Sequence, residues 1–277
     1  MWNLLASAGT PSRILDSNRT HSVLRRAVHT RDLLRELVAR DMKLRYKRSV
    51  LGIVWSLLNP LLQLLILYFV FGVLLSFKIP HYASFLFTGV LVWNWFSSSL
   101  LFATGAIVDN RELIKRPGFP IAILPTVTVT SHLIHFLIAI PALLICIVVD
   151  IGQVSTALVA LPLVIALQFI LTLSLAYLVA TFHVAFRDTQ YLLSVLLQLL
   201  FFLTPIFYAL SFIPEKYRPF LTLNPMVHLL NAYRAILING EWPDSLSLVV
   251  LALGSILLLA IGYRVFVRAS YHFVEEL

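Results

Sequence analysis

The sequence predicts an all-α integral membrane protein with six membrane-spanning helices. Its 277 residues are 60% apolar and only 12% charged, and the mean hydropathy is +0.90. A soluble domain carries about 25% charged residues. Long stretches without charge recur along the chain, and none shows the alternation of a membrane-spanning strand. This composition excludes a soluble globular domain, and so little soluble surface argues against a nucleic-acid partner despite the net charge of +8.

The charge-free stretches define the predicted spans. A helix needs about 20 residues to cross the hydrocarbon layer, and each stretch approaches or exceeds that length. The spans are expected at about 51–75, 84–108, 119–149, 157–186, 189–211 and 245–265. Six spans place both termini on the same side of the membrane.

Lys and Arg residues are divided unevenly between the two sides. The side of the termini holds 17, of which 11 precede residue 51, 3 lie in 109–118, 1 lies at 187–188 and 2 are near the C-terminus. The other side holds 4, which are Lys78, Lys216, Arg218 and Arg234. Cytoplasmic loops carry an excess of Lys and Arg. We therefore expect a multi-pass protein of the cytoplasmic (inner) membrane with both termini in the cytoplasm.

The N-terminal part of the chain divides in two. We expect an irregular tail over 1–28 and a transmembrane domain over 29–277. Residues 30–46 predict an amphipathic helix along the inner membrane surface, because apolar and basic side chains fall on different faces. The apolar set is Leu33, Leu34, Leu37, Val38 and Met42, and the basic set is Arg31, Arg35, Arg40 and Lys43. Amphipathicity alone allows either an anchor to membrane lipids or a surface for a cytoplasmic partner.

A cluster of charges separates the second and third spans. A short helix is expected over 109–116, where Asp109 or Asn110 can cap its start. Basic residues suit its last turn, and Pro117 with Gly118 stops it. Its members are Asp109, Arg111, Glu112, Leu113, Ile114, Lys115 and Arg116. A solvated loop is the simpler interpretation, but alternating charge signs between two spans favour a lever that a cytoplasmic motor could move.

The segment 213–240 lies outside in this topology and is unusually apolar for a loop. We expect two short helices, near 213–222 and 225–238, that re-enter the membrane from outside, with a flat interfacial helix as the alternative. Asn224 can cap the second helix, with Pro225 at its first position. Tyr233 and Arg234 lie near its end, and Arg234 should face protein or water because a charge facing lipid is costly.

Aromatic side chains lie deep in several predicted spans. Aromatic faces can stack on the rings of a ligand, so some of them are candidates for the lining of a path through the membrane. They are Tyr68, Phe71, Trp93, Trp95, Phe96, Phe201, Phe207 and Tyr208. Lipid contact or internal packing is the alternative for each one. His132 and His135 are interpreted as polar packing, and no catalytic, cofactor-binding or metal-binding residues are predicted.

Several blocks of the sequence resemble the permease subunit of type-two ABC exporters, in the branch that exports lipid-linked polysaccharides such as O-antigen, capsule or teichoic acid. They are "RDMKLRYKRSVLGIVWSLLNPLLQLLILYFVF" at 40–71, "NRELIKRPGFPIAILP" at 110–125, "FRD" at 186–188, "FFLTPIFYAL" at 201–210, and "NP" with "YRAIL" at 224–237. The resemblance extends from about Thr30 to the C-terminus.

The resemblance implies a homodimer of permease chains with two ABC ATPase subunits, set among membrane lipids and moving a lipid-linked glycan. It implies that 109–116 is the coupling helix and that 30–46 is an interface helix, and that both lie against the ATPase. It also implies that 213–240 gates the outer end of the transport path. The sequence contains no G-x-x-x-x-G-K-[ST] phosphate-binding motif. ATP and Mg are therefore expected in the partner subunit, and this chain is not expected to be an enzyme.

Other functions remain as alternatives. An ABC exporter of drugs or small lipids would share the same architecture. Ion-coupled carriers usually place ionisable residues at mid-membrane. The predicted spans are uncharged there, so this class is disfavoured. A membrane glycosyltransferase would need acidic or nucleophilic residues at the membrane surface, and no such site can be assembled from the sequence.

Overall fold

The computed structural model of the protein describes residues 12–47, 52–153 and 155–276, and all regular structure within them is helical. The elements are α1 (Ser12–Tyr46), η1 (Gly52–Val54), α2 (Trp55–Leu67), η2 (Tyr68–Leu74), α3 (Tyr82–Gly105), η3 (Val108–Asn110), α4 (Arg111–Ile114), α5 (Ile123–Ile151), η4 (Thr156–Ala160), α6 (Leu161–Ala185), α7 (Thr189–Leu203), η5 (Leu210–Phe212), η6 (Glu215–Tyr217), α8 (Arg218–Thr222), α9 (Pro225–Arg234), η7 (Ala235–Asn239), α10 (Ser245–Ser270) and α11 (Phe273–Glu276). The all-α prediction is confirmed.

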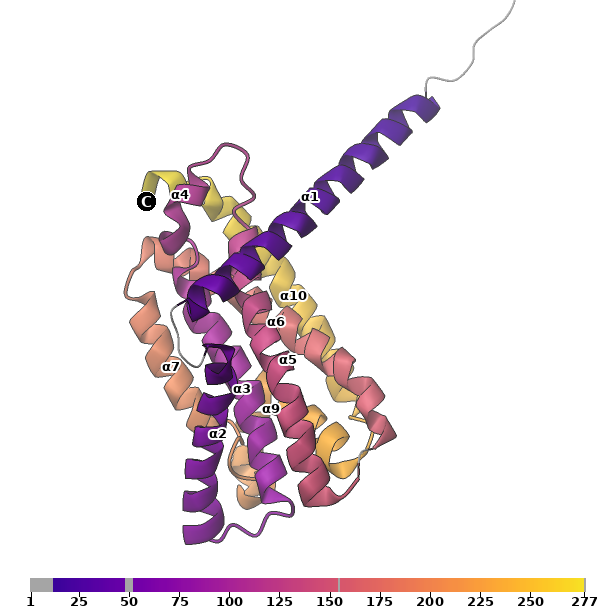
Figure 1. The fold of residues 1–277 in the computed structure, drawn as a ribbon, viewed down its shortest axis with the longest axis vertical. Helices are drawn as coiled ribbons and strands as arrows, with labels where there is room; N and C mark the ends of the chain where they lie inside the picture. The colour runs from indigo at the N-terminus through magenta and orange to yellow at the C-terminus, as the bar shows by residue number, and fades with distance from the viewer. Residues whose placement is uncertain (1–11, 48–51, 154, 277) are drawn as a thin grey trace, which may run out of the picture.

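Five helical segments are long and apolar enough to cross a membrane. They are Trp55–Leu74, Tyr82–Gly105, Ile123–Ile151, Thr156–Ala185 and Ser245–Ser270. They stand together in one bundle (Figure 1). α3 is its central helix, because 67% of its most apolar window is buried, against 6% for the continuous helix of α2 and η2.

The fifth predicted span is shorter in the structure than in the sequence. α7 has only 15 residues and ends at Leu203. Thr204 is extended, with φ −91° and ψ 136°, because a residue that precedes proline disfavours the helical conformation and Pro205 follows it. The charge-free stretch 189–211 is therefore not one helix, and five rather than six described helices reach spanning length.

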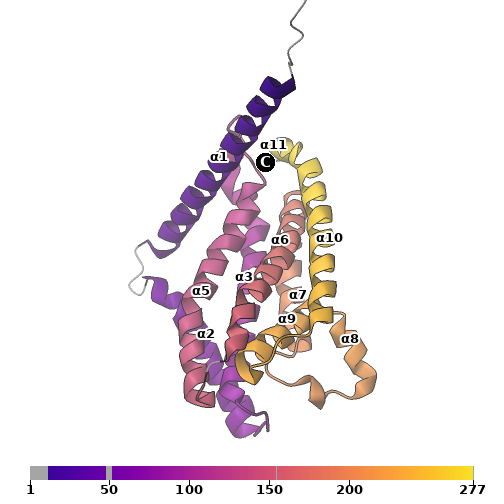
Figure 2. The same cartoon turned by 90° about the vertical axis from the view of Figure 1, so that its right-hand side faces the viewer.

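The N-terminal helix is longer than predicted. α1 begins at Ser12, within the segment 1–28 that we expected to be irregular, while residues 1–11 lie outside the described part. No glycine or proline occurs between Ser12 and Tyr46, so nothing in the sequence interrupts a helix there. α1 crosses one end of the bundle obliquely and extends beyond it (Figures 1 and 2).

Two hydrophobic cores hold the bundle together. The larger one is centred on α3 and extends to α9 and η7. The smaller one lies at the end where α1, α4 and α11 gather (Figures 1 and 2), and we call it the α4-end core. Its buried members are Val38, Ala106, Ile107, Ile114, Ile123, Leu124, Val127, Tyr177, Ala180, Val184, Phe266 and Phe273. The apolar face predicted for 30–46 packs against this core, so it is covered by the protein's own helices.

The segment between α7 and α10 is a series of short helices at the other end of the bundle (Figure 2). α9 is inserted among the long helices: seven of its ten residues are buried, and it contacts α3, α6 and α10. α8, by contrast, presents Phe220 outward at 71% exposure. The two predicted outer helices are therefore present in altered form, since the first is broken into η6 and α8 and the second ends in the π-helical η7.

Candidate functional site

The predicted coupling helix is a two-part element between α3 and α5. A 3-10 turn, η3, precedes the four-residue helix α4, so the regular α-helix is shorter than the predicted 109–116. The expected N-terminal cap is absent: the Asn110 side chain makes no cap hydrogen bond and instead donates from Nδ2 to the carbonyl of Ala106, 3.0 Å away. Gly118, at φ +77°, reverses the chain after Pro117.

This element presents charges on one side and apolar residues on the other. Asp109, Glu112, Lys115 and Arg116 are exposed, and Arg111 and Leu113 are half-buried. Ile114 is only 5% exposed and belongs to the α4-end core. A displacement of α4 would therefore act on that core directly, because close-packed interiors transmit strain.

The α4-end core joins α4 to several other helices. Val38 brings α1 into it, Tyr177 brings α6, and Phe266 brings α10. The hydroxyl of Tyr177 donates to the carbonyl of Ala122 at 3.1 Å and lies 2.9 Å from the hydroxyl of Thr126. The start of α5 is thus also tied to α6. The basic residues predicted on α1, Arg31, Arg35, Arg40 and Lys43, are all exposed on a helix at the same end as α4 (Figure 1).

The opposite end of the bundle is organised around Arg234, the last residue of α9. Its side chain is 7% exposed and donates to the carbonyls of Pro205 at 2.7 Å and Ile206 at 2.8 Å. The guanidinium carbon lies 3.4 Å from the centroid of the Phe85 ring. A buried cation needs such partners, and here backbone carbonyls and an aromatic face supply them. Arg234 thus faces protein.

Glycine makes room for this arrangement. A Cβ atom on Gly89 of α3 would lie 2.8 Å from the carbonyl oxygen of Ile206 and 3.0 Å from Nη2 of Arg234. Only a residue without a side chain allows the chain after α7 to approach α3 so closely.

Two further hydrogen bonds hold the segment 204–208. Asn224 caps α9 by accepting from the backbone N–H of Met226, and its Nδ2 donates to the hydroxyl of Thr204 at 2.9 Å. The hydroxyl of Tyr82 donates to the carbonyl of Phe207 at 2.8 Å. The predicted cap at Asn224, with Pro225 in the first turn, is confirmed. Tyr233, by contrast, is fully buried.

Most of the predicted path aromatics form one connected set of ring contacts between α2–η2, α3, α7 and the segment 204–208. Its best stacked pair is Phe71 with Phe207, at 4.6 Å between centroids and 25° between planes. The contacts run Tyr68–Tyr82–Phe77–Phe71–Phe207, then from Phe207 to Tyr208 and to Phe201, and on to Trp93 and Phe96. Trp95 lies apart, stacked on Phe136 at 4.9 Å. Trp93, Trp95 and Phe96 are each under 5% exposed and pack inside the single chain.

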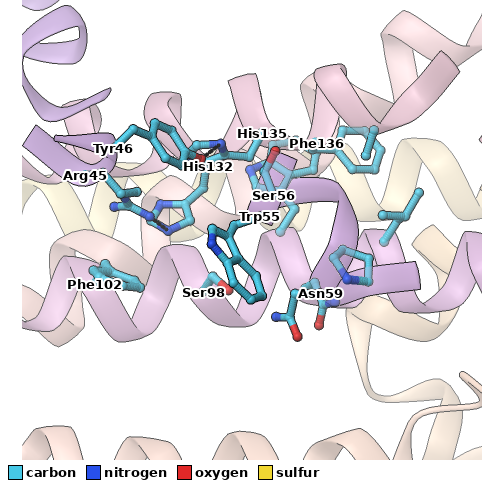
Figure 3. A pocket seen from close by; sticks show the side chains of 15 residues that line it. Arg45, Tyr46, Trp55, Ser56, Asn59, Ser98, Phe102, His132, His135 and Phe136 are labelled. Carbon is cyan, nitrogen blue, oxygen red and sulfur yellow. Dashed lines mark hydrogen bonds between the residues drawn. The ribbon is translucent and has the colours of Figure 1, made fainter. Parts of the chain in front are cut away.

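A cavity of about 400 Å³ lies where the end of α1 meets α2, α3 and α5 (Figure 3). Sequence reasoning missed it. The helix periodicity of 30–46 gave no indication that Arg45 and Tyr46 reach α5, and His132 and His135 were interpreted as polar packing. The sequence places His132 and His135 one helical turn apart, but it does not indicate the partners that α1 brings to them.

Hydrogen bonds fix the state of His132. Nη1 of Arg45 lies 3.1 Å from its Nε2, and a guanidinium can only donate. Nε2 therefore accepts, and Nδ1 carries the proton that is donated to the carbonyl of Thr128 at 2.9 Å. The hydroxyl of Tyr46 lies 2.9 Å from Nδ1 of His135. Burial raises the pKa of Tyr46, so this hydroxyl keeps its proton and can donate it.

No group of three or more His, Cys, Asp or Glu side chains suited to a metal ion occurs among the described residues. The described side chains present exposed charges at one end of the bundle, a carbonyl-bound arginine at the other and aromatic ring contacts between them.

The sequence is similar to known proteins over most of its length. The family model described as ABC-2 type transporter matches residues 32–238. The chain is 38% identical over 258 residues to the O-antigen export system permease protein RfbA of Myxococcus xanthus, covering 92% of this chain and 99% of that protein. It is 34% identical over 247 residues to RfbA of Klebsiella pneumoniae, covering 89% and 95% of the two chains. It is 30% identical over 235 residues to the polysialic acid transport protein KpsM of Escherichia coli, covering 83% and 90%.

Proposed function

This chain belongs to the ABC-2 type transporter family, and from that premise we propose how it works as the transmembrane subunit of a polysaccharide exporter. The observation that carries the function is similarity over almost the whole chain to a permease of O-antigen export, joined by a relative named for polysialic acid transport. The substrate is a lipid-linked polysaccharide, and the site of action is the cytoplasmic membrane.

ATP is hydrolysed by a separate subunit, and α4 is the point where that subunit pushes. The four exposed charges of the element, Asp109, Glu112, Lys115 and Arg116, form the contact, and Ile114 passes the movement into the α4-end core. The exposed basic residues of α1 form a second contact with the same ATPase. Support comes from the position of α1 and α4 at the same end of the bundle (Figure 1) and from the burial of Ile114.

The membrane topology has six crossings, with both termini in the cytoplasm. α7 and the turn that follows it make the fifth crossing in chain order, and the five long helices make the others. The charge distribution supports this orientation, since the basic segments around α1 and α4 share one end of the bundle (Figure 1), while α8 lies at the other end (Figure 2).

Two copies of the chain form the translocation unit, and they meet along α2 and α7. Both helices are poorly covered within the single chain: Leu65 of α2 is 65% exposed, and Leu192 and Leu199 of α7 are 71% and 57% exposed. The connected aromatic set lies between these two helices, so the glycan path runs beside it. α8, α9 and η7 form the outer gate, held closed through Arg234 and Asn224.

A complementation experiment tests the function. Cells lacking this chain should accumulate lipid-linked glycan on the inner side of the membrane and lose it from the surface, and the wild-type gene should restore surface polysaccharide only together with an active ATPase. Restoration with an ATPase that cannot hydrolyse ATP would contradict the proposal. Unchanged surface polysaccharide with altered drug or small-lipid efflux would assign the chain to the other substrate class.

A further inference from the structure

We propose that the cavity between α1, α2, α3 and α5 is a binding site for the phosphate-bearing sugar headgroup of the lipid-linked glycan, with Arg45 as its anion-binding residue. This inference rests on the proposed function and names the place where the substrate is recognised before it moves. The cavity is lined by residues that lie far apart in the sequence, and Figure 3 shows several of their side chains turned toward the same space.

In the proposed topology α1 lies at the cytoplasmic surface and α2 begins the first crossing, so a cavity lined by both would lie near the level of the inner lipid headgroups. Arg45, Tyr46, Trp55 and Ser56 line it where these two helices meet. From there it extends inward to Asn59, Pro60 and Leu91. Its volume of about 400 Å³ falls within the range of about 300–1,000 Å³ typical of small-molecule sites.

Arg45 supplies the charge. Among the described residues that line the cavity, it is the one Lys or Arg, and none is Asp or Glu. Its guanidinium is held in place by Nε2 of His132 at 3.1 Å and by the Phe102 ring, 4.5 Å from ring centroid to guanidinium carbon. A carboxylate of Asp41 lies 3.6 Å from Nη2, one helical turn earlier and outside the cavity lining. A guanidinium has five donors in a rigid fork and suits a phosphate group.

His132 acts as a positioning residue for Arg45. Its Nδ1–H is donated to the carbonyl of Thr128, so the acceptor Nε2 is fixed toward Arg45. The imidazole also lies 5.0 Å from the Phe102 ring, centroid to centroid. This ordering reduces the entropic cost of binding an anion, because the cation is already oriented.

The remaining lining fits a sugar better than an acyl chain. Trp55, 49% exposed, and Phe102, 55% exposed, offer aromatic faces at the mouth against which the C–H face of a pyranose can pack. Asn59, Asn94 and Ser98 add amide and hydroxyl groups that can bond sugar hydroxyls. The amide of Asn94 is oriented by donating to Oε1 of Gln63 at 3.0 Å, which leaves its own carbonyl oxygen as an acceptor. An apolar lipid tail would leave these groups unpaired.

Equilibrium binding to the purified permease–ATPase complex in phosphatidylcholine nanodiscs tests the proposal. The probe is a polyprenyl diphosphate carrying one N-acetylhexosamine, and the competitors are phosphatidylglycerol, the sugar-free polyprenyl monophosphate and free sugar 1-phosphate. We expect Arg45→Gln to weaken probe binding about tenfold or more, the loss of a charge-assisted contact. Arg264→Gln, an exposed residue of α10 with the same change in charge, should bind as the wild type does.

A second variant keeps the test decisive if Arg45→Gln fails to assemble. Ser98→Phe fills the cavity and leaves Arg45, His132 and Phe102 in place, so it should weaken the probe by a similar factor. Wild-type affinity in either assembled variant would overturn the proposal. The proposal would also be overturned if phosphatidylglycerol or the sugar-free lipid displaced the probe as well as the unlabelled probe does, because the site would then recognise any lipid phosphate. Displacement of the probe by sugar 1-phosphate would support recognition of the headgroup.

The outcome is separable from that of the proposed function. If the wild-type complex exports no glycan, the proposed function fails whatever Arg45 does. If it exports glycan and the Arg45 and Ser98 variants bind the probe normally, only this inference fails.

Discussion

Arg234 and Phe85 form a cation–π pair at the end of the bundle opposite α4, with 3.4 Å between the guanidinium carbon and the ring centroid. The same guanidinium donates to the carbonyls of Pro205 and Ile206. One side chain therefore joins α9, α3 and the break after α7. These are the three elements that must separate if the outer gate opens.

Replacing Arg234 should loosen that junction. In Arg234→Met, the carbonyls of Pro205 and Ile206 lose their donor, and each unpaired buried group costs about 1–3 kcal/mol. We expect a lower unfolding temperature of the purified protein and reduced export. Lys216→Met, on the exposed turn η6, removes a charge from the same end and should change neither. Normal unfolding and export in Arg234→Met would show that the junction carries no function.

Gly89 should tolerate no side chain. Gly89→Ala places a Cβ atom 2.8 Å from the carbonyl oxygen of Ile206, and overpacking of this kind costs about 1–3 kcal/mol. Gly254→Ala on α10 is the matched control, since a Cβ there meets nothing within 4 Å and alanine favours a helix by about 1 kcal/mol. Thermal unfolding in detergent should therefore fall for the first variant and stay or rise for the second. The opposite order would mean that α3 and the segment after α7 are not in contact.

Charge reversal on α4 should disrupt binding of the ATPase. Glu112→Lys and Lys115→Glu alter exposed side chains without touching the buried Ile114, so the permease itself should fold normally. Copurification of the ATPase should drop, and export with it. Lys216→Glu, at the other end of the bundle, is the control for a reversed charge. Full copurification with both α4 variants would place the ATPase contact elsewhere.

The aromatic set should matter for export more than for folding. Phe71 is half-buried, so Phe71→Ala removes its stack with Phe207 while most of the core remains. We expect export to fall while the complex still assembles, and Phe71→Leu, which keeps bulk without the ring, to show the same loss. Phe182→Ala, a 51% exposed residue of α6, is the control. Normal export with Phe71→Leu would show that these aromatic rings contribute only to packing.

The sequence predicted what depends on local pattern and composition. Charge-free stretches located the long helices to within a few residues at most ends, and the Asn224–Pro225 pair located the start of α9. The cluster of charges at 109–116 located α4, although the predicted cap and length were wrong. The Asn110 side chain donates to the carbonyl of Ala106 instead of accepting from a backbone N–H of α4.

Contacts between distant elements were beyond the sequence. Nothing local indicates that Arg234 would find the carbonyls of Pro205 and Ile206, or that Arg45 would reach His132, 87 residues away. α7 was predicted to run through Pro205, because the stretch contains no charge, although the residue before a proline resists helical geometry. The continuation of α1 back to Ser12 was missed because polar composition was taken for irregular structure.

The proposed mechanism requires an ATPase that rests on α4 at the cytoplasmic face of the membrane. The most direct measurement is photocrosslinking in living cells, with p-benzoylphenylalanine placed at Glu112 in one strain and at Lys78, in the loop before α3, in another. We expect an adduct with the mass of permease plus ATPase from position 112 and none from position 78. An adduct from position 78, or none from position 112 while export remains normal, would contradict it.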